Sequence, residues 1–430
     1  MKRFLFFLIP ILSIAQFEVS GNITPRGQFY LDSLDTHIDL PFRIGELEAN
    51  LKAGDFYAIA SLAIETRWDS IKNPDYDLRE AYVSWVPSFG EIMLGKQIIP
   101  WGAADGNNPT DNLQPYNFYY LFNSGTDRKN GSFALNSSVY LNNLLVQAVV
   151  LPFHESNTLI KSTDPFPENL KPPRDFTDDE IFFVDGANEL ELGIRIRWSG
   201  TDSDFGFYYF SGNDRNPSPY EFAFVPLQGP TGPLFEMPTK LGFRKTLFYG
   251  LDGVSFWGDF TFRFEGAYFQ THNSSESQYD LSADYYQTVL QLEYSTPWDI
   301  TVTAQYIQSA TLNLDFETHV FPKTSRFVPL DIEDAFMPGM GTPFAMITNK
   351  SIMLMSSTEL FDSDLELGFA SLIDLEETGA MVNISVNYLI EEKLELGLGT
   401  SFFKGENTET NNFHAMESFS NASVNLSFKF

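Results

Sequence analysis

The last nine residues, from Ala422 to Phe430, constrain the fold of this chain more than any other stretch. They read A-S-V-N-L-S-F-K-F, so every second residue is apolar and the residues between them are polar. Successive side chains of a β-strand point to opposite faces, and the alternation therefore predicts a terminal strand with one apolar and one wet face. The last strand of a soluble β-sandwich is the alternative, but a chain that stops on an aromatic residue is less ordinary there.

The first fifteen residues have the pattern of a secretory signal peptide. Lys2 and Arg3 precede an apolar run from Phe4 to Ile14, and small residues occupy the two positions that a signal peptidase reads. We predict that residues 1–15 are removed and that residues 16–430 form a single domain. The apolar run is too short to span a bilayer as a helix, and no later stretch has enough consecutive apolar residues. In a membrane, this chain is therefore expected to cross as strands.

The C-terminal alternation resembles the assembly signal of bacterial outer-membrane β-barrels. A barrel strand has lipid on one side and a wet lumen on the other, and its edge must pair to close the barrel. The resemblance assigns this signal to Leu426, Phe428 and Phe430. It implies outer-membrane lipid and the barrel-assembly machinery as partners, and the outer membrane of a Gram-negative-type bacterium as the location.

The composition excludes some classes of protein. The chain has no cysteine, which rules out a disulfide framework and a lipid-anchored N-terminus. Its net charge is -30, or -32 once Lys2 and Arg3 are removed, and it has no cluster of Lys and Arg, so nucleic acid is not expected as a partner. Aromatic residues make up 16% of the chain at a mean hydropathy of -0.16, which suits a barrel with aromatic girdles and a polar interior.

Alternating segments, separated by very short or by long connections, continue along the mature chain. We predict an all-β fold, a transmembrane antiparallel up-and-down β-barrel of about 18 strands, with 16 as the alternative. Short periplasmic turns and long extracellular loops would connect the strands. Pro25 predicts an irregularity in the first strand because proline cannot donate to the ladder. One turn is predicted at Leu251-Asp252-Gly253, between segments from Leu241 to Gly250 and from Val254 to Gln270.

The stretch from Leu78 to Phe118 is the most distinctive inside the chain. A segment that ends in Gly-Lys-Gln leads to Trp-Gly and then to a loop rich in Asp and Pro. It resembles a family of porin-like outer-membrane proteins, in the style of phosphate-selective and alginate-export porins, which have Arg where this chain has Lys96. The matching residues are Glu80, Ala81, Tyr82, Gly95, Lys96, Gln97, Trp101, Gly102, Asp105, Asp111 and Pro115. The resemblance implies a barrel for transport and names no solute.

We expect the loop after this segment to fold into the lumen and narrow it, because its Gly and Asn residues suit sharp turns. The candidate constriction residues are Lys96, Gln97, Trp101, Asp105 and Asp111, with Trp101 packed at the barrel rim. Asp105, Asn107 and Asp111 also offer oxygen ligands at a spacing loosely suitable for Ca²⁺. Turn residues that cap their own backbone are the alternative. No other cofactor is expected.

Charged residues on two segments alternate with apolar ones and are therefore predicted to face the lumen. They are Glu189, Glu191, Arg195, Arg197, Arg263 and Glu265. An Arg on the lipid face costs about 2–4 kcal/mol at mid-bilayer, so a wet lumen is the place for these charges. They either create a transverse field that orients solute or pair with one another as a structural ladder. Because acids outnumber bases, a weak preference for cations is expected.

These features predict a porin or channel that lets small hydrophilic or amphipathic solutes diffuse through a loop-constricted, charged lumen. A structural barrel that anchors a partner or handles lipid or hydrophobic cargo is the alternative. An enzyme is less expected, because the histidines are scattered and no Gly-x-Ser-x-Gly elbow occurs. No catalytic residue is assigned, and a monomer and a homotrimer both fit the pattern.

Overall fold

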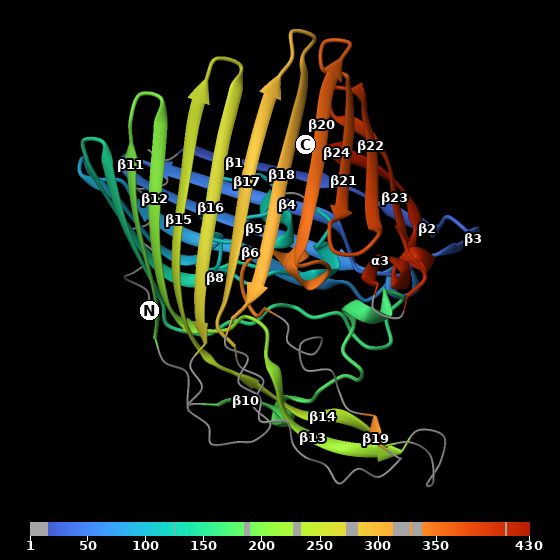
Figure 1. The fold of residues 1–430 in the computed structure, drawn as a ribbon. Helices are drawn as coiled ribbons and strands as arrows, with labels where there is room; N and C mark the ends of the chain where they lie inside the picture. The colour runs from blue at the N-terminus through green and yellow to red at the C-terminus, as the bar shows by residue number, and fades with distance from the viewer. Residues whose placement is uncertain are drawn as a thin grey trace, which may run out of the picture.

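The protein is described by a computed structural model that covers residues 16–123, 125–184, 190–226, 234–271, 283–312, 327–328, 338–408 and 411–430. Eighteen antiparallel strands form one closed barrel, as predicted (Figure 1). The predicted signal peptide, residues 1–15, lies outside the described residues. Within the described part of the chain, no helix is long and apolar enough to cross a membrane.

The first barrel strand is built from two pieces, β1 (Gln16–Ile23) and β2 (Arg26–Tyr30). The other barrel strands are β4 (Phe42–Ala53), β5 (Phe56–Thr66), β6 (Asp75–Trp85), β7 (Gly90–Gln97), β8 (Ser132–Leu141), β9 (Leu144–Leu151), β11 (Glu191–Ser199), β12 (Ser203–Asn213), β15 (Lys245–Trp257), β16 (Phe260–Thr271), β17 (Tyr285–Ser295), β18 (Ile300–Thr311), β20 (Lys350–Leu360), β21 (Leu365–Asp374), β22 (Gly379–Glu391), β23 (Leu394–Gly405) and β24 (Asn421–Lys429). Each pairs with its neighbour, and β24 pairs with β1 and β2 to close the ring. The break at Pro25 confirms the predicted irregularity.

Short hairpin turns connect the strands at one end of the barrel, and longer connections extend from the other (Figure 1). A small sheet of β10 (Ile181–Phe183), β13 (Ser218–Pro226), β14 (Leu234–Phe243) and β19 (Phe327–Val328) lies beyond the long-loop end. The remaining small elements are β3 (Ser33–His37), α3 (Asn412–Ala415) and the 3-10 helices η1 (Trp68–Ser70), η2 (Phe118–Tyr120), η3 (Gly125–Arg128), η4 (Glu168–Leu170), η5 (Asp178–Glu180), η6 (Pro343–Met346) and η7 (Glu417–Phe419).

One predicted turn is wrong. The hairpin between β15 and β16 turns at Gly258-Asp259, and Gly253 lies inside β15, paired with Phe264. Gly258 has φ of +63°, a left-handed conformation that glycine adopts without steric cost. The segment from Leu241 to Phe243 belongs to β14 instead. Asp-Gly and Gly-Asp occur within eight residues of each other here, and the sequence pattern did not distinguish the two turns.

The outer face of the barrel is apolar on strands all round the ring. Exposed side chains on outward positions include Leu47, Val83, Leu94, Leu135, Phe207, Leu251, Leu290, Leu354, Phe369, Ile384, Leu398 and Val424. Leu426, Phe428 and Phe430 lie on this face of the last strand, 42%, 46% and 49% exposed. Such a belt is the surface that a membrane barrel presents to lipid.

The core lies inside the lumen, because the long connections fold back into it. One cluster contains Trp101, Leu113, Phe210 and Phe248, and a second contains Phe166, Phe344, Met416 and Phe419 from different loops. Side chains in both clusters are almost fully buried although many of them belong to loops. The barrel interior is therefore largely filled by its own connections at the long-loop end.

Candidate functional site: the lumen constriction

The connection between β7 and β8 folds into the lumen, as its composition predicts. We call residues 98–131 the inner loop, of which residue 124 lies outside the described residues. Gly102 and Gly106, with φ of +94° and +82°, provide the two sharp changes of direction. Trp101 and Leu113 are 2% and 0% exposed, which is unusual for a loop and shows that the inner loop packs against the barrel wall.

Glu265 on the inner face of β16 is the main anchor of the inner loop. Its Oε1 accepts hydrogen bonds from the backbone N–H groups of Ala103 at 2.5 Å and Ala104 at 2.6 Å. Its Oε2 accepts one from the Thr110 hydroxyl at 2.8 Å and a longer one from Thr110 N, and Asn108 Nδ2 makes a longer contact with Oε1. The carboxylate is 2% exposed. One wall carboxylate therefore satisfies polar groups from three parts of the inner loop.

Asp105 continues this attachment along β16 and β17. Its Oδ2 accepts hydrogen bonds from Arg263 at 2.9 Å and Gln291 at 2.7 Å, and its N–H donates to Gln291 Oε1 at 2.9 Å. Arg263 also contacts Glu293 at 2.8 Å. The Asp105 side chain remains 56% exposed, so this carboxylate both holds the inner loop and faces the open lumen.

Trp101 lies within the lumen rather than at the barrel rim, which corrects its predicted position. Its ring packs against Tyr208 with centroids 5.1 Å apart, and its Nε1 donates to Gln147 Oε1 at 3.0 Å. The wall residue beneath it is Gly193, where an added Cβ would lie 2.6 Å from Leu113 and 2.9 Å from the Trp101 ring. The indole reaches the wall because Gly193 leaves that space free.

We expect the substitution Gly193→Leu to displace the inner loop. The added side chain occupies the space of Trp101 and Leu113, and such overpacking costs about 1–3 kcal/mol. Limited proteolysis should cut the inner loop faster, and Trp101 emission should shift to longer wavelength. Ile194→Leu is the matched control, because Ile194 alternates to the outward side of β11. Unchanged proteolysis in Gly193→Leu would contradict the packing argument.

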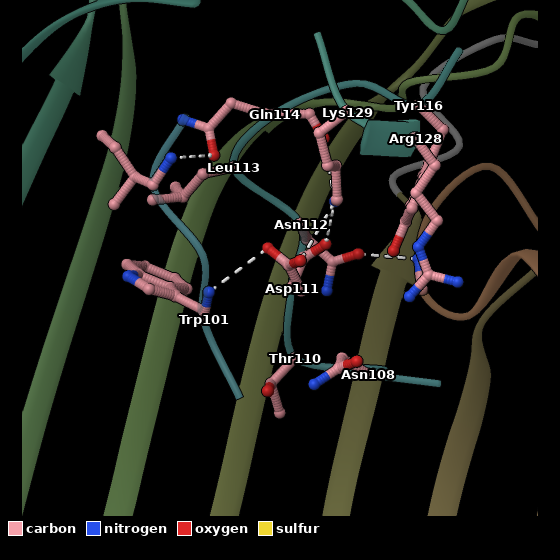
Figure 2. Close-up of polar contacts among 12 residues, drawn as sticks. Trp101, Asn108, Thr110, Asp111, Asn112, Leu113, Gln114, Tyr116, Arg128 and Lys129 are labelled. Atoms are coloured by element: carbon pink, nitrogen blue, oxygen red, sulfur yellow. Dashed lines mark hydrogen bonds and ion pairs between the residues drawn. The ribbon is translucent and has the colours of Figure 1, made fainter. Parts of the chain in front are cut away.

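Asp111 and Lys129 form the second support of the inner loop, at its base (Figure 2). Asp111 Oδ1 accepts from Trp101 N at 3.3 Å, and Asp111 Oδ2 lies 3.4 Å from Lys129 Nζ. Lys129 Nζ also donates to the carbonyls of Asp111 and Gln114, and it lies 3.7 Å from the centre of the Tyr116 ring. Burial lowers the pKa of Lys129 to about 8, although the Asp111 carboxylate opposes this shift.

The structure places the two residues before the inner loop on opposite faces of β7. Gln97 points inward, is 2% exposed, and donates to the carbonyl of Ala134 at 2.9 Å. Lys96 shares the outward parity of Leu94, pairs with the exposed Phe133, and has its Nζ 3.6 Å from Asp77. The prediction that Lys96 lines the pore is therefore wrong, because the strand alternation directs its stem away from the lumen.

The charges predicted on β11 have the expected inward parity but mostly have partners. Glu191 is 0% exposed and contacts His154 and Arg215, each at 2.8 Å. Arg195 lies over the Tyr208 ring at 5.4 Å, and Arg197 contacts Asp204. Glu189 lies outside the described residues. Glu191 thus pairs with two residues of the long connections, whereas Arg195 and Arg197 contact residues of the neighbouring strand β12. These contacts favour a structural role for Glu191.

The three predicted calcium ligands each have protein partners. Asp105 contacts Arg263, Asp111 contacts Lys129, and Asn107 Oδ1 accepts from the Thr342 hydroxyl at 2.5 Å. Asn107 Nδ2 donates to Gln305 at 3.2 Å. These oxygens therefore point to separate partners of the inner loop and the wall. Calcium binding by this set stays a prediction.

The inner loop leaves a cavity of about 580 Å³ on the opposite side of the lumen. Its wall side is made of small, uncharged polar residues of β22, β23 and β24: Asn383, Ser385, Asn387, Gly399, Ser401, Asn421, Ser423 and Asn425. Aromatic side chains, including Tyr119, Phe122 and Phe166, line its other side. We did not predict this wall as a site, although the alternation of Asn, Ser and Gly in the last strands was visible in the sequence.

Comparison with known proteins supports the fold. The sequence matches no protein-family model and no curated protein. The structure is similar to Pseudomonas aeruginosa OccK5 (OpdH), with a TM-score of 0.53 at 10% identity over 98% of this chain and 99% of that one. Acinetobacter baumannii OccAB3 gives 0.53 at 12% identity, over 97% and 99%. The outer membrane protein OpdK from Pseudomonas aeruginosa gives 0.52 at 7% identity, over 96% and 99%. These similarities establish the barrel architecture.

Proposed function

We propose that this chain is an outer-membrane channel through which small hydrophilic or amphipathic solutes diffuse, with a preference for cations. The observation that carries the proposal is the cavity of about 580 Å³ between the docked inner loop and the uncharged wall of β22–β24. A narrowed but open lumen with polar lining is what selective diffusion requires. The apolar belt and the barrel fold shared with outer-membrane channel porins support the location.

The preference for cations rests on the charges that face the lumen. Glu46 and Glu48 alternate with Leu47 on β4, and Glu80 and Glu91 lie on the inward side of β6 and β7. Asp105 adds a half-exposed carboxylate at the constriction. The net charge of the chain, -30, is also negative, like the excess of charge that faces the lumen. A lumen with an excess of fixed negative charge concentrates cations.

Single-channel conductance of the refolded mature chain in a planar bilayer tests the proposal. Discrete steps and a cation-selective reversal potential in a salt gradient are the expected result. A folded, heat-modifiable barrel that conducts nothing would contradict it and favour a barrel that anchors a partner. The proposal involves no covalent chemistry.

We expect the double substitution D105N/D111N to lower the cation preference. At contact in water a unit charge interacts with a monovalent ion by about 1 kcal/mol, so the permeability ratio should fall severalfold. Arg263 and Lys129 would also lose carboxylate partners, which adds positive potential to the lumen. The reversal potential in a salt gradient measures the ratio. An unchanged permeability ratio would show that the inner loop does not contribute to the ion selectivity of the channel.

We expect the cation preference to rise as the pH increases from 7 to 9.5, because Lys129 loses its proton near pH 8. An unfolded lysine titrates near 10.5, so the folded chain binds fewer protons than the unfolded chain above about pH 8. Linkage therefore raises the free energy of unfolding as the pH rises from about 8 towards 10.5, whereas below about pH 8 the penalty for burying the protonated lysine is present in full. In K129M the reversal potential should be flat over the same range. An identical pH profile in both proteins would exclude Lys129 as the titrating group.

A further inference from the structure

The barrel wall has a seam in which the strand ladder is interrupted. β1 pairs with β4 up to Ile23 and Gly45, and one further hydrogen bond joins Thr24 N to Ile44 O at 2.8 Å. Beyond this point β2 pairs with β24 and with β3 instead. Residues 42 and 43 of β4 pair only with β5 in the part of the chain that the structure describes. We call the gap between residues 26–28 of β2 and residues 42–43 of β4 the seam.

A tryptophan side chain closes the seam in place of a strand. Trp68, from η1 in the connection after β5, donates from its Nε1 to the carbonyl of Arg26 at 2.7 Å. Its ring packs on Phe42 with centroids 5.2 Å apart, and the indole is 40% exposed. The next backbone contact of β2 is from Ile38 N to Gln28 O at 2.7 Å. Trp68 thus contacts both edges of the seam, where the structure describes no strand pairing between β2 and β4.

Two cavities meet at the seam from opposite sides. On the lumen side, the cavity of about 580 Å³ is bordered by Arg26, Phe42 and Trp68. On the outer face, a groove of about 510 Å³ is lined by Pro25, Arg26, Gly27, Phe29, His37, Trp68, Val424, Asn425 and Leu426. Arg26, Trp68 and Asn425 border both spaces, so single residues separate the lumen cavity from the outer groove at this point.

Arg26 gives the seam a charge preference. Arg43 and Arg67, which lie nearby, contact Glu65 at 3.2 Å and Asp164 at 2.9 Å. Arg26 has no carboxylate within ion-pair distance among the residues that the structure describes, although its side chain is only partly exposed. Arg26 shares the inward parity of Gln28 and pairs with Asn425, so its side chain lies on the lumen side of the seam. An anionic group that reaches through the seam while its apolar chain stays in the outer groove would satisfy this cation. Asp69 beside the groove is itself 3.4 Å from His37.

We propose that the seam is a lateral portal for a single-chain amphiphile with an anionic head, which enters from the outer face and passes Trp68 into the lumen. The apolar chain lies in the outer groove against Phe29, Val424 and Leu426, and the head passes Trp68 to contact Arg26 on the lumen side. The uncharged Asn and Ser wall of β22–β24 then receives the head inside the lumen. Entry through the seam differs from entry along the barrel axis, and both lead to the cavity of about 580 Å³.

A photoreactive alkyl sulfonate with a diazirine on its chain tests the portal in liposomes that contain the full refolded chain. Mass spectrometry should locate adducts mainly at Phe29, Val424 and Leu426. In R26Q the yield should fall about tenfold, as expected for the loss of one charge-assisted contact. R174Q, which changes an arginine of an extramembrane loop, is the matched control and should label as the unchanged chain does. Heat-modifiability confirms that each variant is folded.

One further variant and one further probe distinguish the portal from general labelling of the lipid-facing surface. W68A should raise the yield of adducts on the lumen residues Asn383 and Ser423 severalfold, because the indole no longer separates the two cavities. The trimethylammonium analogue of the probe should label the groove no more than it labels Phe207, an exposed belt residue on β12. Equal labelling of the groove and Phe207 by the sulfonate, or an undiminished yield in R26Q, would overturn the proposal. The assay needs no conduction, so its failure leaves the channel proposal intact.

Discussion

Replacing Glu265 with alanine should release the inner loop and enlarge the channel. The carboxylate accepts hydrogen bonds from Ala103, Ala104 and Thr110, and these donors would be left buried without it. A buried donor that loses its acceptor costs about 1–3 kcal/mol, so the loss of all three bonds costs roughly 3 kcal/mol or more. At 1.4 kcal/mol for each factor of ten, the ratio of docked to undocked loop should fall more than a hundredfold. Single-channel recordings should show larger and noisier steps and a weaker ion preference.

E293Q is the matched control for this variant. Glu293 lies on the same wall and contacts Arg263 at 2.8 Å, but it makes no described contact with the inner loop. Its steps should keep the size of the unchanged channel. E265Q should fall between the two, because the amide keeps one acceptor oxygen and adds donors that face other donors. If E265A conducted as the unchanged channel does, the inner loop would not be the constriction.

Deleting Phe430 should greatly reduce the amount of folded barrel in the membrane. At the turn end, β24 meets β1 only through Asn22 with Lys429 and Ile23 with Phe428, and through two hydrogen bonds between Gly21 and Phe430 at 3.0 and 3.1 Å. The Phe430 ring lies over Gly21, where an added Cβ would approach it to 2.8 Å. Two hydrogen bonds and this contact contribute roughly 2–3 kcal/mol, enough for at least a tenfold loss of closed barrel.

Two further variants separate the contributions at this closure. F430A keeps the backbone hydrogen bonds and loses only the ring, so its loss should be smaller than that of the deletion. F260A removes an exposed belt aromatic from β16, away from the closure, and should assemble normally. The fraction of heat-modifiable protein in isolated outer membranes measures each of them. Normal levels of the deletion variant would show that the C-terminal residue does not contribute to closure or to assembly.

The sequence predicted the architecture well because strand alternation is a local signal. Period-two patterns, an even strand count and turn residues at short connections follow from residues next to one another in the chain, and eighteen strands are what the structure contains. The exceptions also have local causes. The turn at Gly258 was misplaced because Gly253 lies close by with the same residue types, and Lys96 was assigned to the pore from a motif rather than from its parity with Leu94.

The site was harder to predict because it depends on contacts between distant segments. Nothing next to Glu265 in the sequence indicates that it holds Ala103, 162 residues away. The sequence around Gly193 indicates only a strand, and the need for a glycine there follows from the position of Trp101 in the folded chain. The parity of the β11 charges was correct, but the pairing of Glu191 with His154 and Arg215 requires the folded loops. Local patterns thus identify which residues face the lumen, and only the fold shows which of them remain free.

The inner loop is fastened to β16 and β17, whereas the cavity borders β22, β23 and β24. The strands that hold the inner loop are therefore different from the strands that line the cavity. Exchanging Asn383, Ser385 or Asn425 for other polar residues should alter which solutes are admitted while the attachment of the loop is preserved. Substitutions on β22, β23 and β24 are therefore expected to change the permeability while the stability of the barrel and the position of the inner loop stay the same.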